Sequence, residues 1–295
     1  MAGNAGAGKA GENAVNGGGG GAGGVGYIGG AGDIGGVSRR RIGELADMLF
    51  EAERARRQVP PLTAAEPRLG ADSAYAVQLE NVRRAVKMGH SISGKKIGLT
   101  SNGIQQQLGV SEPDYGHLFA AMECRGGAVD TGALIQPKIE AEIAFVLKAG
   151  LSGGHVTPED VRKATDYVVG AFEIVDSRVA DWKIKLPDTV ADNASSGRYV
   201  LGEKKLRIGD VDLPRVGMRL YKGGELAGEG TGAAVLGDPC AAVAWLANCL
   251  WKYGVELAAG EVILSGAFSA APAAAKGDAF AAEFTEFGRV EARFA

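Results

Sequence analysis

The chain has 295 residues, of which 46% are hydrophobic and 23% charged, and its formal net charge at pH 7 is −3. These values are typical of a soluble globular protein and exclude the broad basic surface that nucleic acid or an anionic membrane would attract. Three cysteines without a CxxC pair, no secretory leader and no apolar run of roughly 18–20 residues predict a cytoplasmic protein with reduced thiols and no membrane span.

Residues 1–36 are set apart by glycine, which fills 17 of these 36 positions, and by a near absence of large apolar side chains. This composition predicts a flexible, disordered tail. Two GxGxxG patterns occur in it, at residues 6–11 and 30–35, but neither follows a predicted strand, so neither indicates a dinucleotide site. We expect one folded domain over residues 37–295, with a helical N-terminal part over about 37–90.

Helix signals and short β-rich runs intermix along the rest of the chain. Helical periodicity with capping residues, among them Asp72, Thr157 and Asp238, predicts helices at residues 38–58, 72–89, 157–167 and 238–254. The β-rich runs predict strands at residues 141–147, 167–175, 217–224, 260–267 and 279–294, the last containing a turn at 285–288. Because this order lacks regular strand–helix alternation, we predict an α+β fold with a mixed, largely antiparallel sheet and flanking helices.

The run QPKIEAEIAFVL, residues 136–147, is strongly apolar yet carries two glutamates one residue apart. Successive side chains of a strand point to opposite faces, so Glu140 and Glu142 share one face while Ile139 and Ile143 lie on the other. Two like charges side by side away from water are costly unless a cation or hydrogen-bond donors compensate them. The alternative is a solvent-exposed polar face.

A third carboxylate occurs in a second apolar run, YVVGAFEIVDSR, where Glu173 shares a strand face with Ala171 and Val175. If the two strands are neighbours, the three glutamates converge as a site made only of oxygen ligands. Hard divalent cations such as Mg²⁺ or Mn²⁺ favour such ligands, and the lack of a nearby histidine argues against zinc.

Several motifs together resemble the 2-hydroxypenta-2,4-dienoate (2-keto-4-pentenoate) hydratases, in the hydratase/decarboxylase branch of the fumarylacetoacetate hydrolase superfamily. They are GKKIGLTS, QQQLGVSEPDYGHLFAAM, QPKIEAEIAFVL, FEIVDSRVADWKIKLPDTVADNASSG and LAAGEVILSGA, and the resemblance covers roughly residues 42–294. It implies a single catalytic domain with a β-roll core, a homo-oligomer, and Mg²⁺ or Mn²⁺ held by three acidic side chains. The family's metal ligands fall on Glu140, Glu142 and Glu173.

The resemblance also implies metal-dependent hydration of 2-hydroxypenta-2,4-dienoate to 4-hydroxy-2-oxopentanoate, in the meta-cleavage degradation of aromatic compounds. The lysine of the G-[RK]-K-[IV]-G-L-T motif falls on Lys96 and the aspartate of the P-D-[FY]-G motif on Asp114, which makes them candidates for proton transfer. The resemblance further favours Asn193 and Ser195 as substrate contacts. From the residues alone, a surface charge is the usual reading for Lys96 and a turn residue for Asp114, and the segment 188–197 could be a self-bonded loop.

Two other functions remain open at this point. A sister enzyme, the metal-dependent 4-oxalocrotonate decarboxylase, would use a similar scaffold to remove CO₂ from the dicarboxylate 2-oxohex-3-enedioate. A non-catalytic, metal-bound partner subunit of a pathway enzyme is the second, although an intact acidic triad with Lys96 argues against it. Association with a downstream aldolase or with the sister decarboxylase is a further expectation.

Overall fold

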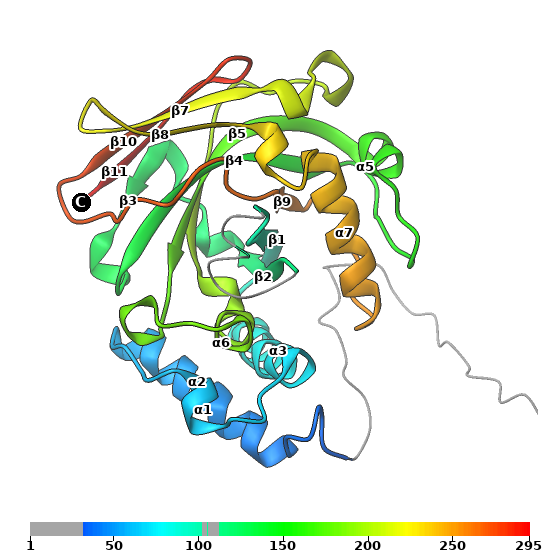
Figure 1. Ribbon diagram of the computed structural model, residues 1–295, viewed down its shortest axis with the longest axis vertical. Helices are drawn as coiled ribbons and strands as arrows, with labels where there is room; N and C mark the ends of the chain where they lie inside the picture. Colours follow the sequence, from blue (N-terminus) through cyan, green and yellow to red (C-terminus); the bar gives the residue numbers. More distant parts are fainter. Residues whose placement is uncertain (1–31, 102–104, 106–111) are drawn as a thin grey trace, which may run out of the picture.

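The computed structural model describes residues 32–101, 105 and 112–295, so that the first 31 residues of the tail predicted over residues 1–36 lie outside the described part. Its helices form two groups (Figure 1). α1, α2, α3 and α6 lie together at one end of the molecule, and α5 packs on α7 beside the strands. The helix bounds are α1 Arg39–Ala55, α2 Leu62–Ala65, α3 Ala71–Lys87, α5 Pro158–Ala164, α6 Leu186–Ala191 and α7 Pro239–Trp251.

The strands form two sheets. A six-stranded sheet has the order β2-β1-β9-β4-β5-β6 and a five-stranded sheet the order β3-β11-β10-β7-β8. Their bounds are β1 Ile92–Gly98, β2 Asp114–Phe119, β3 Ala128–Val129, β4 Pro137–Leu147, β5 Thr165–Asp176, β6 Ser196–Leu201, β7 Gly217–Lys222, β8 Glu225–Thr231, β9 Val262–Leu264, β10 Ala279–Phe284 and β11 Gly288–Phe294. Among the paired strands, β1 with β9 and β11 with β3 are parallel and the rest antiparallel, which confirms the predicted α+β fold with its mixed, largely antiparallel sheet.

The six-stranded sheet curls on itself. Its edge strands β2 and β6 contact each other, and the long strands β4 and β5 arch over the short strands β1 and β2 (Figure 1). A sheet curled in this way has an inner face, and side chains alternate between the inner and outer faces along each strand. The curl therefore brings inner-face residues of distant strands together, as the β-roll prediction requires.

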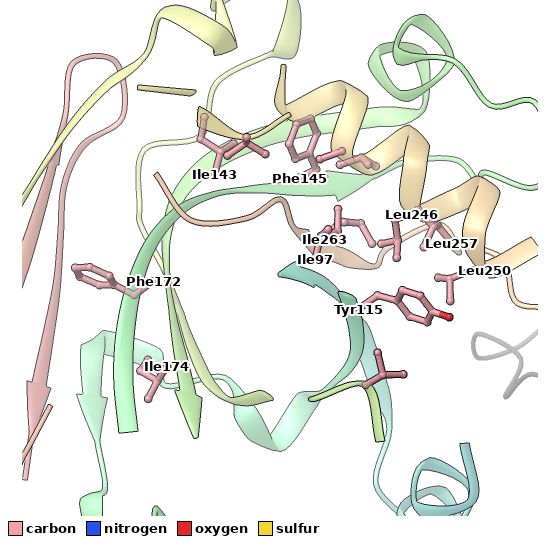
Figure 2. Close-up of a cluster of buried hydrophobic side chains, with 14 of the residues drawn as sticks. Ile97, Tyr115, Ile143, Phe145, Phe172, Ile174, Leu246, Leu250, Leu257 and Ile263 are labelled. Atoms are coloured by element: carbon pink, nitrogen blue, oxygen red, sulfur yellow. The ribbon is translucent and has the colours of Figure 1, made fainter. Parts of the chain in front are cut away.

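The outer face of this sheet carries the main apolar core. Figure 2 shows Phe145 of β4 and Ile263 of β9 near Leu246 and Leu250 of α7, with Ile143 farther along β4. All five are at most 1% exposed. The predicted alternation in β4 is thereby confirmed, because the odd-numbered positions from 139 to 147 belong to the main apolar core and leave Glu140 and Glu142 on the inner face.

Helix ends follow the capping signals in two of three cases. Thr157 caps α5 and forms a capping box with Asp160, and Asp238 caps α7, as predicted. The prediction for α3 is wrong, because Gly70 is the N-cap and Asp72 lies in the first turn. An aspartate in the first turn favours a helix start by its charge alone, so sequence does not separate the two positions.

A further difference concerns one apolar segment. The 20-residue stretch Gly232–Trp251 contains an 18-residue window with a mean hydropathy of 1.4 and so satisfies the length and composition of a membrane span, contrary to the prediction that no run does. In the fold, α7 begins only at Pro239, and its buried face, including Val243 and Leu246, packs in the core. The hydropathy of this segment is that of a core helix.

The described chain begins with a tight hairpin before α1. Ile34 and Val37 exchange two backbone hydrogen bonds, of 2.9 and 3.0 Å, across Gly35 and Gly36, which both have positive φ. Such a turn favours glycine at both central positions. Ile34 is 8% exposed and Val37 fully buried, so ordered contacts start a few residues before the predicted boundary at 37.

Candidate functional site

The antiparallel pairing of β4 and β5 brings the three glutamates together. Glu140 lies directly opposite Glu173, and Glu142 follows two residues along on the same face of β4. One carboxylate oxygen from each residue lies within 4.8 Å of the other two. The predicted convergence of the three side chains on neighbouring strands is present in the described structure, inside the curled sheet.

Two of the three carboxylates of this cluster are buried and short of hydrogen-bond donors, and Glu140 is partly exposed. Glu142 and Glu173 are fully buried, and within the described residues Glu142 Oε1 and both oxygens of Glu173 have no hydrogen-bond partner. Glu142 Oε2 accepts from the Gly266 backbone N–H at 2.8 Å. Burial raises the pKa of Glu140, Glu142 and Glu173 above the ordinary range. A hard divalent cation would supply the missing partners of these oxygens, so the residues fit the predicted metal.

Lys96 extends from β1 into the same cluster. Its Nζ lies 3.2 Å from Glu173 Oε1, and the side chain is 3% exposed. Burial acts to lower the pKa of Lys96, but the charges of Glu173 and Asp114 outweigh it and raise the pKa above the ordinary value. Lys96 is thus a buried cation of the site, and the alternative of a solvated surface charge is wrong.

Asp114 begins β2 and lies opposite Gly98 at the end of β1. Because Lys96 is two residues before Gly98, the antiparallel register puts Lys96 and Asp114 on one face of the strand pair. Asp114 is 2% exposed, and its Oδ2 accepts a hydrogen bond from the Thr189 hydroxyl at 2.7 Å. It is a buried strand residue, and the alternative of an ordinary turn position is wrong.

Glycine at position 98 gives these two side chains their room. A Cβ atom there would lie 2.3 Å from Asp114 Oδ1 and 3.2 Å from Lys96 Nζ. Asp114 Oδ1 and Lys96 Nζ therefore both lie above a residue without a side chain.

Gly98→Ala is expected to displace the Asp114 carboxylate and to lower turnover while leaving metal affinity close to that of the wild type. The reason is steric, because an added methyl group would overlap Asp114 Oδ1 but no metal-site glutamate is among the nearest atoms. Steady-state kinetics beside metal titration measures both quantities. Gly209→Ala is the control, since a Cβ at Gly209 meets nothing within 4 Å. Full turnover in Gly98→Ala would contradict the close approach.

Comparison with known proteins assigns the chain to a family. The model of the fumarylacetoacetate (FAA) hydrolase C-terminal family matches residues 123–295. The chain is 46% identical to a 2-keto-4-pentenoate hydratase of Paraburkholderia xenovorans, over 85% of this chain and 94% of the relative. It is 47% identical to a 2-hydroxyhexa-2,4-dienoate hydratase of Comamonas testosteroni, over 79% of this chain and 89% of the relative. This chain belongs to the hydratase/decarboxylase branch of the fumarylacetoacetate hydrolase superfamily.

A solved structure of the superfamily is similar over nearly its whole length. The 4-oxalocrotonate decarboxylase of Pseudomonas putida G7, solved in complex with magnesium and adipate, is 40% identical to this chain. The match covers 88% of this chain and 99% of the decarboxylase, with a TM-score of 0.85. The same enzyme was also solved with calcium and acetate. Divalent cations are thus found with this superfamily scaffold, in agreement with the acidic cluster described above.

Asn193 and Ser195 lie in a left-handed turn packed on β2. Residues 193, 194 and 195 all have φ between 50° and 54°. The Asn193 side-chain amide donates to the His117 carbonyl at 2.9 Å and accepts from the His117 backbone N–H at 2.7 Å. Gly116 permits this approach, because a Cβ there would lie 2.3 Å from the Asn193 carbonyl oxygen. The Asn193 amide is therefore engaged in fixing the turn, and substrate contact by Asn193 or Ser195 stays a prediction.

A buried ion pair holds this turn from behind. The Arg178 guanidinium bonds the Asp192 carboxylate and also donates to the carbonyl oxygens of Asp176 and Ser196, at 2.7 and 2.9 Å. Arg178 is 5% exposed and Asp192 2%. Our sequence reasoning did not single out Arg178, Thr189 or Gly98. The sequence held a signal for two of them: Arg178 is an arginine within the segment IVDSRVA, and Thr189 is a threonine within the segment DTVADNASSG.

Proposed function

We propose that this protein is a divalent-metal-dependent hydratase that converts 2-hydroxypenta-2,4-dienoate to 4-hydroxy-2-oxopentanoate in the meta-cleavage degradation of aromatic compounds. The observation that carries this proposal is a cluster of three glutamates, two of them fully buried with oxygens that accept no hydrogen bond in the described structure, beside the ammonium group of Lys96. Relatives at 43–47% identity that are named as hydratases of 2-keto-4-pentenoate or of 2-hydroxyhexa-2,4-dienoate support the same reaction.

The ligands of the cation in this proposal are Glu140, Glu142 and Glu173, and the cation is Mg²⁺ or Mn²⁺. When bound, the ion would hold the oxygens of the substrate's 2-hydroxy acid end and would stabilise negative charge that develops there. Glu142 and Glu173 are fully buried, so water would be excluded from this side of the substrate. Charge interactions inside the site would be stronger for the same reason.

Lys96 and Asp114 would move the protons. In the first stage the C2 hydroxyl loses its proton and C5 gains one, which gives 2-oxopent-3-enoate. In the second stage water adds across the C3–C4 double bond, so that C4 gains the hydroxyl group and C3 the proton. Both stages need a proton donor and acceptor at fixed positions, and Lys96 Nζ and Asp114 Oδ1 are the buried pair of such groups gathered above Gly98.

Decarboxylation of 2-oxohex-3-enedioate is the second candidate function. The similarity to the solved 4-oxalocrotonate decarboxylase supports it, as does Lys138, on the same face of β4 as Glu140. Lys138 Nζ lies 4.3 Å from the centre of the Trp182 ring. A dicarboxylate has a second anionic group, and a half-buried cation beside the acidic wall is suited to bind it.

The product decides between these reactions. Purified protein with Mg²⁺ or Mn²⁺ is incubated with 2-hydroxypenta-2,4-dienoate and, separately, with 2-oxohex-3-enedioate, and the products are followed by NMR. We expect 4-hydroxy-2-oxopentanoate from the first substrate and little loss of CO₂ from the second. Preferential CO₂ release would favour the decarboxylase. No turnover of either substrate with either metal would overturn the proposed activity and leave the role of a partner subunit.

We also propose that the protein is a homo-oligomer, on the basis of the family resemblance. Met88 and Val86 at the end of α3 are 57% and 39% exposed, which is the kind of apolar surface that a second copy would cover. Size-exclusion chromatography with light scattering gives the mass directly. Repeating it in a mixture with a downstream aldolase or the sister decarboxylase tests the expected association with either enzyme.

A further inference from the structure

The two carboxylate oxygens of Asp114 have different surroundings. Oδ2 accepts a hydrogen bond of 2.7 Å from the Thr189 hydroxyl. Oδ1 is buried and has no hydrogen-bond partner within the described residues. It is also the oxygen that lies above Gly98, toward Lys96 Nζ. Buried acceptors without a donor are rare and costly in folded proteins, so an unpartnered oxygen at this position suggests a functional reason.

Thr189 is held rigidly enough to fix the other oxygen. It is 3% exposed and lies on α6, a short helix whose start is tied to the N-terminal part of the chain. Asp188, the residue before it, is fully buried and accepts hydrogen bonds from the Thr63 backbone N–H and hydroxyl at 2.8 and 2.9 Å. Asp188 also accepts from the Lys185 backbone N–H at 2.9 Å. These bonds set the position of α6, and the β-branched side chain of Thr189 has few rotamers available.

The bond of Thr189 differs from the local one that threonine usually makes in a helix. A helical threonine commonly donates to the carbonyl oxygen four residues before it. Here the hydroxyl spans 75 residues of sequence to reach Asp114 instead. A hydroxyl has one proton to donate, and giving it to Oδ2 fixes the orientation of the carboxylate and leaves Oδ1 as the oxygen without a donor.

We propose that Thr189 is a positioning residue for the reaction: its hydroxyl holds Asp114 by Oδ2 and so presents Oδ1 beside Lys96 as the oxygen that exchanges a proton with the substrate. The proposal rests on the hydratase function proposed above, in which Asp114 takes part in proton transfer. It assigns the two oxygens separate tasks, one of orientation and one of chemistry.

The test compares Thr189→Val, which has nearly the same shape but no hydroxyl, with Thr189→Ser, which keeps the hydroxyl. With 2-hydroxypenta-2,4-dienoate, Thr189→Val should lower kcat by about 10- to 100-fold, the factor that corresponds to one hydrogen bond to a charged group. KM and metal affinity should stay near the wild-type values, because the acidic cluster is untouched. Thr189→Ser should restore most of kcat.

Thr165→Val is the matched control. Thr165 is 1% exposed, and its hydroxyl donates to the Val161 carbonyl at 2.7 Å, at the far end of β5 from Glu173. This variant also loses one buried hydroxyl bond, so its melting temperature should fall about as much as that of Thr189→Val while kcat is retained. A similar loss of kcat in Thr165→Val and Thr189→Val, or in Thr189→Ser and Thr189→Val, would show a merely structural role and overturn the proposal.

The outcome of the wild-type assay separates this proposal from the proposed function. If the wild type hydrates the dienoate and Thr189→Val matches its kcat, only the role of Thr189 is refuted. If the wild type turns over neither substrate, the hydratase function is refuted, and crystal structures of the three forms decide the orienting bond. The Asp114 carboxylate should then rotate in Thr189→Val and keep its place in Thr189→Ser, and an unchanged carboxylate in Thr189→Val would overturn the proposal.

Discussion

Glu142→Gln is expected to weaken binding of Mg²⁺ or Mn²⁺ by about 10²-fold or more, since even second-layer partners of a metal site are worth 10- to 100-fold. Turnover should fall with the bound metal. The variant removes one formal negative charge from a cluster whose oxygens lie within 4.8 Å of one another. In the metal-free protein the neutral amide relieves repulsion between carboxylates, so the fold should be at least as stable as the wild type. Isothermal titration with each metal and thermal melts with and without chelator measure both effects.

Glu261→Gln is the control, and we expect the reverse of both effects: a less stable fold and unchanged metal affinity. Glu261 is also buried, but its Oε1 lies 2.5 Å from Lys95 Nζ. Removing its charge leaves a buried lysine without a counter-charge, which should cost about 3 kcal/mol of unfolding free energy. Metal affinity should be retained, because Lys95 and Lys96 are adjacent in β1 and point to opposite faces. Unchanged metal affinity in Glu142→Gln, or full turnover of metal-free wild type, would refute the assignment of the ligands.

The acidic cluster was predictable because its information is local. The two-residue period of β4 determines that Glu140 and Glu142 share a face, and the apolar run around Glu173 identifies a second buried strand. The pairing of β4 with β5 and the register that puts Glu173 opposite Glu140 had to come from the structure. The α+β fold with a mixed sheet could likewise be predicted, from the order of the helical and β-rich segments.

The rest of the site depends on contacts between distant segments. Lys95 reads as a surface charge until its partner Glu261 is known, 166 residues away. Asp114 likewise reads as a turn residue until its partner Thr189, 75 residues away, is known. Strands β1 and β2 were not predicted as a pair because their lysines and aspartate reduce the apolar signal, and these are the residues that carry the proposed chemistry. Local patterns fail where buried charges are compensated by tertiary contacts.

Lys96→Met is expected to lower kcat by about 10²-fold or more, the usual contribution of a positioned acid or base. Methionine keeps most of the side-chain volume, so the loss reflects the missing ammonium group and not a cavity. Metal affinity should not decrease, because the substitution removes a cation that lies 3.2 Å from a carboxylate oxygen of Glu173. Kinetics and metal titration on one preparation test both statements.

Lys95→Met is the matched control, since it replaces a lysine that is equally buried and ion-paired but lies on the outer face. It should lower the melting temperature and leave kcat of the folded enzyme near that of the wild type. Proton NMR in deuterated water then assigns the step at which Lys96 acts. A Lys96→Met enzyme that incorporates deuterium at C5 but no longer adds water places Lys96 in the hydration stage, and one that does neither places it at protonation of C5. Wild-type kcat in Lys96→Met would instead leave Asp114, held by Thr189, as the sole proton-transfer group of the site.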